Sequence, residues 1–320
     1  MATVSGQLKD ASINGKPRDL MNVIYNISPT DTPFLTLCGR TDATQTLHEW
    51  QTESLAAPAA NAQLEGADVS SFAEIATEEL SNKTQILLKA VSVSGTGQAI
   101  KQAGVDKQYA HQMALKAKEL KKDVEFALLS NQLAAAEGGG AGRKMQGLPC
   151  WLWDNYDGGS GGSAAVYGSS AAVAGTKRAV TQALVTGMLT DIYEAGGNPD
   201  RIMAAPELRV KLSSVLRGSG DNQIEWADKK KAYSVVDVFV SDFGAVRLIP
   251  NRVQTGVTYA ADCAFVIDPE YWKVAYLRGF QEKRLADTGD SIKGMINVEC
   301  TLQASNPASS GLIADLDPDL

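Results

Sequence analysis

Residues 158–162 are the nearest match to a catalytic motif, because their sequence GGSGG fits the GxSxG pattern of hydrolases. In that pattern the serine occupies a sharp turn between a β-strand and an α-helix. Both flanks are rich in glycine here, so we interpret Ser160 as a loop residue. A soluble hydrolase that uses Ser160, Asp191 or Glu194 is an alternative, and loss of a measurable turnover on alanine substitution would support it.

Metal-binding and phosphate-binding patterns are incomplete as well. The two histidines, His48 and His111, are expected on a surface strand and an exposed helix face, and two isolated histidines do not build a metal site. Residues 138–144 (GGGAGRK) resemble a phosphate loop, yet no Ser or Thr follows the lysine and no strand precedes the segment. The sequence therefore predicts no catalytic residue, no cofactor and no metal.

Composition narrows the class of protein further. A net charge of −7 disfavours a surface that grips nucleic acid by its phosphates. No apolar run approaches the roughly 18 residues of a membrane span, and the N-terminal sequence does not resemble a signal peptide. The four cysteines are widely spaced and are expected to be reduced thiols. Three acidic residues match only the opening of a calcium loop and are interpreted as an acidic tail: Asp315, Asp317 and Asp319.

A single long helix, expected over residues 105–137, is the main element of the first half. Its apolar positions recur at helical spacing: Val105, Tyr109, Met113, Ala117, Leu120, Val124 and Leu128. The stripe drifts by about 140° along its length, so it needs more than one partner surface. Its solvent side is expected to carry Lys116, Lys118, Glu119, Lys121, Lys122 and Glu125. We expect Asp106 to cap this helix and the glycines at 138–140 to end it.

A projecting hairpin is expected before this helix. Two strand-like runs, residues 44–52 and 83–94, are separated by the polar, alanine-rich residues 54–81. In the second run, Ile86 and Leu88 share one face. A connection that long does not suit the interior of a compact domain, so it predicts a hairpin that extends away from the body. Ahead of it, three prolines mark residues 1–43 as an extended arm.

The hairpin connection is acidic, with no Lys or Arg between Ser54 and Ser81. Its acidic residues are Glu65, Asp68, Glu74, Glu78 and Glu79. Either it is a solvated loop with incidental charge, or it docks on a basic surface of a neighbouring subunit. The basic candidates are Lys116, Lys118, Lys121 and Lys122, or residues 229–231. Exposed pairs of this kind would set geometry more than affinity.

The second half begins with residues 138–175, a glycine- and serine-rich segment broken by the apolar patch at residues 148–153 and interpreted as a flexible linker or an exposed loop. Helices are expected from residue 176 to the glycines at 196–197 and from Pro206 to about residue 216. Strands are expected at 201–205, 233–240, 245–249, 264–267, 272–277 and 292–302. In the last strand Ile296, Val298, Cys300 and Leu302 should face inward, and Asn297, Glu299 and Thr301 outward. The mixed order favours an α+β fold.

Two motifs give the chain a family resemblance. Residues 18–34 (RDLMNVIYNISPTDTPF) are similar to the opening signature of one branch of phage capsid proteins, and residues 198–206 (NPDRIMAAP) to a helix–strand–helix passage of the same branch. Over nearly the whole chain, the order of elements resembles the major capsid proteins of tailed double-stranded DNA phages, which have the Hong Kong 97-like fold.

This resemblance implies a division of the chain. It gives an N-terminal arm (1–40), an extended loop (41–96), a peripheral domain with a spine helix (97–147), a Gly/Ser-rich loop or insertion (148–175), an axial domain (176–259), return strands of the peripheral domain (260–305) and a C-terminal tail (306–320).

The resemblance also implies a function. The chain would self-assemble as hexamers and pentamers into an icosahedral virion shell that encloses double-stranded DNA without sequence-specific binding. The extended loop has no lysine between Ser54 and Ser81, so we expect non-covalent contacts between arms, loops, spine helices and axial domains. Scaffolding, portal and decoration proteins would be separate, and assembly would occur in the host cytoplasm. The shell of a non-viral, encapsulin-like nanocompartment is the alternative, which the arm signature disfavours.

Overall fold

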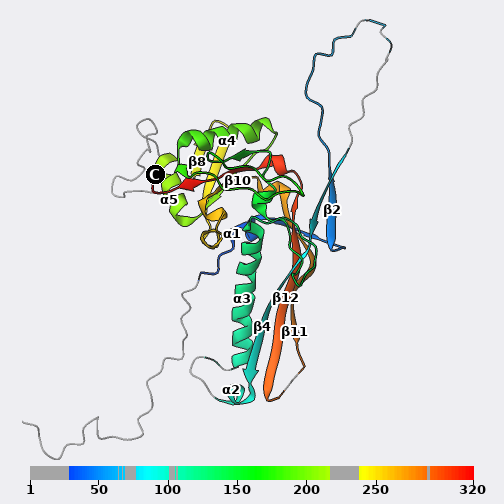
Figure 1. Cartoon of the computed structure of the whole chain (residues 1–320), viewed down its shortest axis with the longest axis vertical. Helices are drawn as coiled ribbons and strands as arrows, with labels where there is room; N and C mark the ends of the chain where they lie inside the picture. The colour runs from blue at the N-terminus through cyan, green and yellow to red at the C-terminus, as the bar shows by residue number, and fades with distance from the viewer. Residues whose placement is uncertain are drawn as a thin grey trace, which may run out of the picture.

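The computed structural model describes residues 29–63, 65–66, 68, 77–100, 105, 107–216, 238–286 and 289–320. Its architecture is α+β, as expected, and is built on two large sheets. One hydrophobic cluster joins the four-stranded sheet to one side of the six-stranded sheet, and a second cluster lies on the other side of the six-stranded sheet. A long helix runs beside the strands of one sheet, and a hairpin projects in the opposite direction (Figure 1).

The long helix α3 spans Gln108–Leu129, so it has 22 residues and is shorter than expected at both ends. Its apolar stripe is confirmed, because Met113, Leu120, Val124 and Leu128 are buried. The helix stops where the chain turns back on itself: a Cβ on Gly147 would lie 1.9 Å from the carbonyl oxygen of Ser130. The expected cap, Asp106, lies outside the described residues, and the cap position is Lys107.

A four-stranded sheet lies against α3, in the order β1 (Gly39–Asp42), β11 (Trp272–Arg284), β12 (Ser291–Ala304) and β4 (Gln85–Ser94). β1 runs parallel to β11, and the other neighbours are antiparallel. The short helices α1 (Pro33–Leu37) and α2 (Gly95–Ala99) lie ahead of β1 and after β4.

The expected outward face of β12 is wrong at its C-terminal end. Glu299 is 3% exposed and Thr301 is fully buried. The expected alternation of buried and exposed residues fails at this end because both faces of the strand are covered. Arg143 covers Glu299 on the face that was expected to be exposed.

The projecting hairpin is confirmed, with a different second strand. β2 (Leu47–Thr52) pairs antiparallel with β3 (Glu78–Lys83), whereas β4 continues into the main sheet. The acidic Glu78 and Glu79 therefore belong to a strand at the base of the hairpin.

A six-stranded sheet forms the second body. Its order is β5 (Tyr156–Asp157), β13 (Gly311–Ile313), β10 (Ala264–Ile267), β7 (Arg201–Ala204), β9 (Gly244–Pro250) and β8 (Val238–Ser241). The helices α4 (Gln182–Glu194) and α5 (Pro206–Leu216) supply buried side chains to its cluster. Pro206 opens α5 as expected. α4 starts later than expected, because β6 (Arg178–Ala179) pairs with β14 (Leu316–Asp317) before Thr181 caps the helix.

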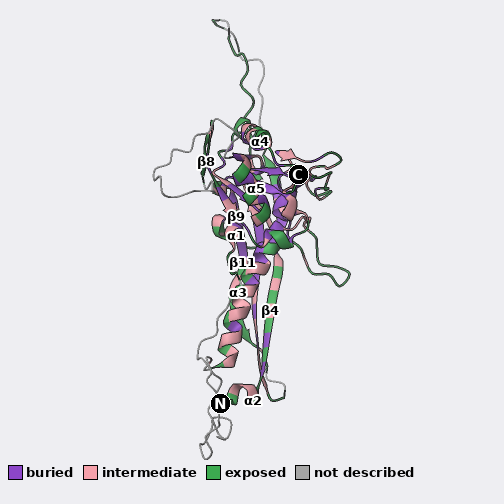
Figure 2. Ribbon diagram, turned by 90° about the vertical axis from the view of Figure 1, so that its left-hand side faces the viewer, coloured by how far each residue is buried: buried purple, intermediate pink, exposed green. Residues whose placement is uncertain are grey.

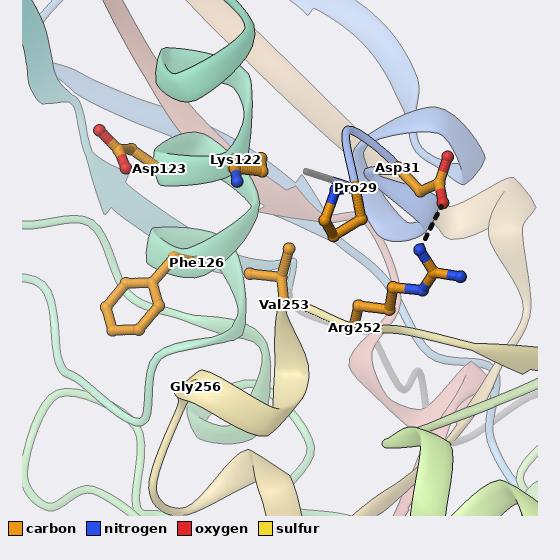
Figure 3. A pocket seen from close by; sticks show the side chains of 8 residues that line it. All are labelled: Pro29, Asp31, Lys122, Asp123, Phe126, Arg252, Val253 and Gly256. Carbon is orange, nitrogen blue, oxygen red and sulfur yellow. Dashed lines mark ion pairs between the residues drawn. The ribbon is translucent and has the colours of Figure 1, made fainter. Parts of the chain in front are cut away.

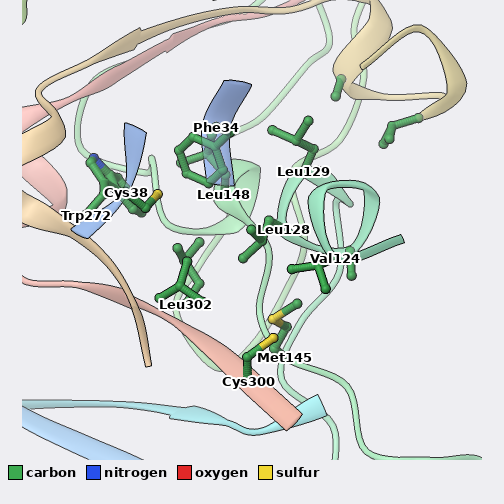
Figure 4. Close-up of a cluster of buried hydrophobic side chains, with 14 of the residues drawn as sticks. Phe34, Cys38, Val124, Leu128, Leu129, Met145, Leu148, Trp272, Cys300 and Leu302 are labelled. Carbon is green, nitrogen blue, oxygen red and sulfur yellow. The ribbon is translucent and has the colours of Figure 1, made fainter. Parts of the chain in front are cut away.

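Two loop assignments are wrong. Residues 138–175 are not an exposed linker throughout, since Met145, Leu148 and Trp151 are fully buried in the cluster that Figure 4 shows beside α3. The acidic tail is also packed, because β13 lies inside the six-stranded sheet and Asp315 is 4% exposed. Five 3₁₀ turns complete the described part of the chain: Leu148–Cys150, Gln254–Gly256, Ala260–Asp262, Pro269–Tyr271 and Pro307–Ser309.

Candidate subunit interface

The structure keeps the two predicted charge groups apart within one subunit. Glu65 and Asp68 are exposed in the hairpin connection, and Glu78 and Glu79 are exposed on β3. Glu74 and residues 229–231 lie outside the described residues. On α3, Lys118 and Lys121 are exposed, Lys122 is half-buried, and Lys116 pairs with Glu119 at 2.7 Å. The hairpin extends away from α3 (Figure 1), so any contact between the groups needs a second copy.

The base of the hairpin is fixed by aromatic side chains. Trp50 on β2 lies 5.4 Å from Trp151, ring centroid to centroid, and Trp151 lies 5.6 Å from Tyr167. Trp153 completes the group at 5.5 Å from Tyr167. The indole N–H of Trp50 also donates to the carbonyl oxygen of Ala304 at 2.8 Å. This cluster ties the hairpin to β12 and to the segment after α3.

Polar contacts fix the same base. The amide of Asn82 donates to the carbonyl oxygen of Leu302 at 2.7 Å, and the Tyr167 hydroxyl accepts from the backbone N–H of Ser81 at 2.7 Å. His48 lies 3.1 Å from the side-chain oxygen of Gln303, which gives this histidine a structural contact. The direction of the hairpin is thus set by buried contacts at its base, while its distal residues are exposed.

Glu125, expected on the wet side of α3, is fully buried. Its carboxylate accepts from the backbone N–H groups of Phe34 at 2.9 Å and Leu35 at 2.7 Å, and from the amide of Asn251 at 2.7 Å. Burial raises the pKa of Glu125 above its ordinary value, and these three donors partly offset that shift. The side chain joins α1, α3 and the loop after β9.

Glu299 makes a second buried junction. Its carboxylate pairs with Arg143 at 2.6 Å and Arg278 at 2.7 Å, and it accepts from the hydroxyl of Thr84 at 2.9 Å. Two guanidinium groups compensate the buried charge of Glu299. Because Arg143 follows α3 and Glu299 lies on β12, their ion pair fixes the segment after α3 against the sheet. No periodicity in the sequence distinguishes Glu125 or Glu299 from exposed carboxylates.

A groove of about 280 Å³ opens beside α3 and is lined in part by Pro29 (Figure 3). Phe126 and Val253 form its apolar wall, and Lys122 lies on its rim. Asp31 and Arg252 face each other at 4.0 Å across an exposed rim. This groove is a further accessible surface of the helix.

The structure brings no catalytic group together among the described residues. Ser160 lies in a turn after the two-residue β5, and no helix follows before Gln182, whereas Asp191 and Glu194 lie on α4. His111 lies on α3, far in sequence from Ser160 and from the two carboxylates of α4. The glycine-rich loop does not form a nucleophile elbow. It is held in place by Asp315, whose carboxylate accepts hydrogen bonds from the backbone N–H groups of Gly159 and Gly175, both at 2.9 Å.

Metal, thiol and membrane features complete the inventory for the described part of the chain. No group of three or more His, Cys, Asp or Glu is placed to hold a metal ion. The four cysteines are buried and unbridged, and burial raises the pKa of Cys300 to about 12. None of the described helices has the length and apolar character needed to cross a membrane.

A projecting hairpin, a long helix against a four-stranded sheet, and a separate six-stranded α/β body define the Hong Kong 97-like fold of phage capsid subunits. The capsid protein of Cyanophage A-1(L) superposes with a TM-score of 0.63, at 14% identity and covering 96% of this chain and 98% of that one. The SrpI encapsulin of Synechococcus elongatus shares the fold at a TM-score of 0.57 and 12% identity, covering 98% of each chain.

The chain belongs to the SU10 major capsid protein family, whose model matches residues 3–317. The major capsid protein of Escherichia phage Phieco32 is 27% identical over 337 residues, which cover 94% of each protein. The chain is therefore the major capsid protein of a phage, a subunit of the capsid shell and a structural component of the virion.

Proposed function

We propose that this subunit closes an icosahedral shell around double-stranded DNA by non-covalent contacts, with the hairpin of one copy docked on the next. The observation that carries the proposal is the hairpin itself, whose base is fixed by Trp50, Asn82 and Tyr167 while its acidic connection is exposed. A rigidly aimed element with exposed ends suits a contact between copies. Closure multiplies many weak contacts, so no single pair needs to be strong.

The charge of the subunit supports its role as a container. A net charge of −7 reduces adhesion of packed DNA to the inner surface, because phosphate binding needs concentrated basic charge. Hexamers and pentamers would meet through the six-stranded bodies, and assembly would take place in the host cytoplasm. Scaffolding, portal and decoration proteins would be separate chains, and the subunit would have no enzymatic activity.

Charge reversal tests hairpin docking. Replacing Glu65, Glu78 and Glu79 together with lysine should lower the yield of shells and weaken the salt sensitivity of assembly, measured by negative-stain microscopy and sedimentation. Glu137→Lys, at an exposed carboxylate outside the hairpin, is the matched control. Assembly of the triple variant with unchanged yield and salt sensitivity would show that the acidic charge is incidental.

A further inference from the structure

The groove beside α3 has an apolar wall that the described part of the chain leaves open. Phe126 on this wall is 45% exposed. Both carboxylates that line the groove already have partners, since Asp31 faces Arg252 at 4.0 Å and Asp123 pairs with Lys89 at 2.8 Å. An occupant of the groove would therefore bind mainly through apolar side chains.

The size of the groove limits what this occupant can be. Its volume of about 280 Å³ is just below the about 300–1,000 Å³ that is typical of small-molecule pockets. Such a space takes a few side chains of a short segment, whereas a stable contact with a folded partner buries at least about 1,000 Å². Its apolar wall comes from two elements, with Phe126 on α3 and Val253 in the loop after β9.

The segment that precedes Pro29 is attached at this groove. Pro29 itself lines the groove, and the hydrogen bond of Glu125 to Phe34 holds the following helix α1 against α3. Figure 2 shows α1 beside α3. Because each residue of extended chain spans at most about 3.6 Å, Ile27 lies within about 7 Å of Pro29 and Ile24 within about 18 Å. The residues just before Pro29 therefore stay close to the groove.

Residues 20–28 (LMNVIYNIS) have the composition of an apolar occupant. They carry no charged side chain, and Leu20, Val23, Ile24 and Ile27 recur at helical spacing. The asparagines of the segment fall between these positions, so they leave one side apolar. Burial of such a stripe is favourable in proportion to the apolar area that it removes from water.

We propose that the groove beside α3 is the seat of residues 20–28 of the same chain, with Ile24 and Ile27 against Phe126 and Val253. The short tether favours the chain's own segment over that of a second copy, because it gives a local concentration in the millimolar range. Held there, the segment covers the apolar wall of α3 and leaves the residues before it to reach other copies. This inference does not depend on hairpin docking, since every group in it belongs to one subunit.

Cysteine cross-linking of unassembled subunits tests the seat. The four native cysteines are buried, so a short bismaleimide reports on introduced pairs. Ile24→Cys with Lys122→Cys, on the rim of the groove, should give a monomer that migrates faster on a denaturing gel, because the cross-link closes a long loop. The matched pair is Ile24→Cys with Lys121→Cys, one position away at an exposed residue that does not line the groove. Closure of both pairs to the same extent, a covalent dimer from the groove pair, or no cross-link overturns the seat.

Hydroxyl-radical footprinting gives a second test that needs no cysteine pair. In wild-type unassembled subunits, labelling of Phe126 should be low and independent of subunit concentration. Ile24→Asp with Ile27→Asp should raise this labelling several-fold. Asn22→Asp with Asn26→Asp adds the same charge away from the apolar stripe and should leave the labelling unchanged. Equal labelling in the two double variants, or protection of Phe126 that appears only at high concentration, overturns the seat.

Discussion

The carboxylate of Glu125, in the middle of the long helix, accepts a hydrogen bond of 2.9 Å from the backbone N–H of Phe34, 91 positions earlier in the chain. Phe34 lies in the first turn of α1, whose backbone donors have no partner within that helix. A side chain from α3 therefore caps α1 and fixes that short helix against the long one.

Removal of this cap should destabilise the subunit. Glu125→Ala leaves the N–H groups of Phe34 and Leu35 buried without an acceptor, at about 1–3 kcal/mol for each. Chemical denaturation of the unassembled protein should show the loss, and Glu119→Ala on the exposed side of α3 should cost less than about 1 kcal/mol. Equal losses in the two variants would contradict the assignment.

The pH dependence of this site follows from its raised pKa. A folded-state pKa above the ordinary value of 4.5 means that the folded subunit binds the proton of Glu125 more tightly than the unfolded chain does. Its stabilising contribution is fully present below pH 4.5 and is lost as the pH rises through the folded value. The difference in unfolding free energy between wild type and Glu125→Gln should therefore fall as the pH rises from 4.5 through the folded-state pKa. A difference that rises over this range contradicts the shift.

Substitution of Glu299 should destabilise the subunit more than substitution of its partner Arg143. Glu299→Ala leaves two facing guanidinium groups without their carboxylate and should cost about 3–5 kcal/mol. Arg143→Ala should cost less, because Arg278 still pairs with Glu299 at 2.7 Å. Thermal unfolding of the two variants gives the comparison, and a greater loss for Arg143→Ala would show that packing by its side chain matters more than the charge.

Two glycines give a matched test of backbone packing. Gly147→Ala places a methyl group 1.9 Å from the carbonyl oxygen of Ser130 and should destabilise the turn after α3. Gly187→Ala, at an exposed position inside α4 with nothing within 4 Å, should stabilise the subunit by about 0.5–1 kcal/mol. Melting temperatures should move in opposite directions, and a shift of the same sign in both would contradict the packing at residue 147.

Tyr167→Phe should loosen the hairpin without unfolding the subunit. It removes the acceptor of the Ser81 N–H while preserving the ring stack with Trp151, at a cost of about 1 kcal/mol. Hydrogen exchange should accelerate at Ser81 and not at Leu302 in β12. Unchanged exchange at Ser81 would mean that the aromatic stack alone fixes the base.

The helices and strands that could be predicted from the sequence are those with a clear spacing of apolar residues or a local backbone signal. The stripe from Met113 to Leu128, the strand at 201–204 and the helix that Pro206 opens follow from spacing and backbone preference. The family resemblance identified the fold. The end of α3 at Leu129 was not predicted from the local sequence, and in the structure Gly147 packs closely against Ser130, the residue that follows this helix.

The buried polar residues could not be predicted for a related reason. Glu125 and Glu299 resemble surface carboxylates until Phe34 and Arg143, distant in sequence, are placed beside them. Likewise, the glycine-rich segment resembled an exposed linker because its anchor, Asp315, lies about 150 positions away. Each of these sites is formed by long-range contacts, which leave no periodic pattern.

The parallel pairing of β1 with β11 joins residues 39–42 to a strand that begins at Trp272. Synthesis of more than two thirds of the polypeptide therefore precedes completion of that sheet, and such distant pairings form slowly. The base of the hairpin depends on β12, which is made later still. A nascent chain on the ribosome therefore has neither the complete four-stranded sheet nor a fixed hairpin until most of the polypeptide has been made.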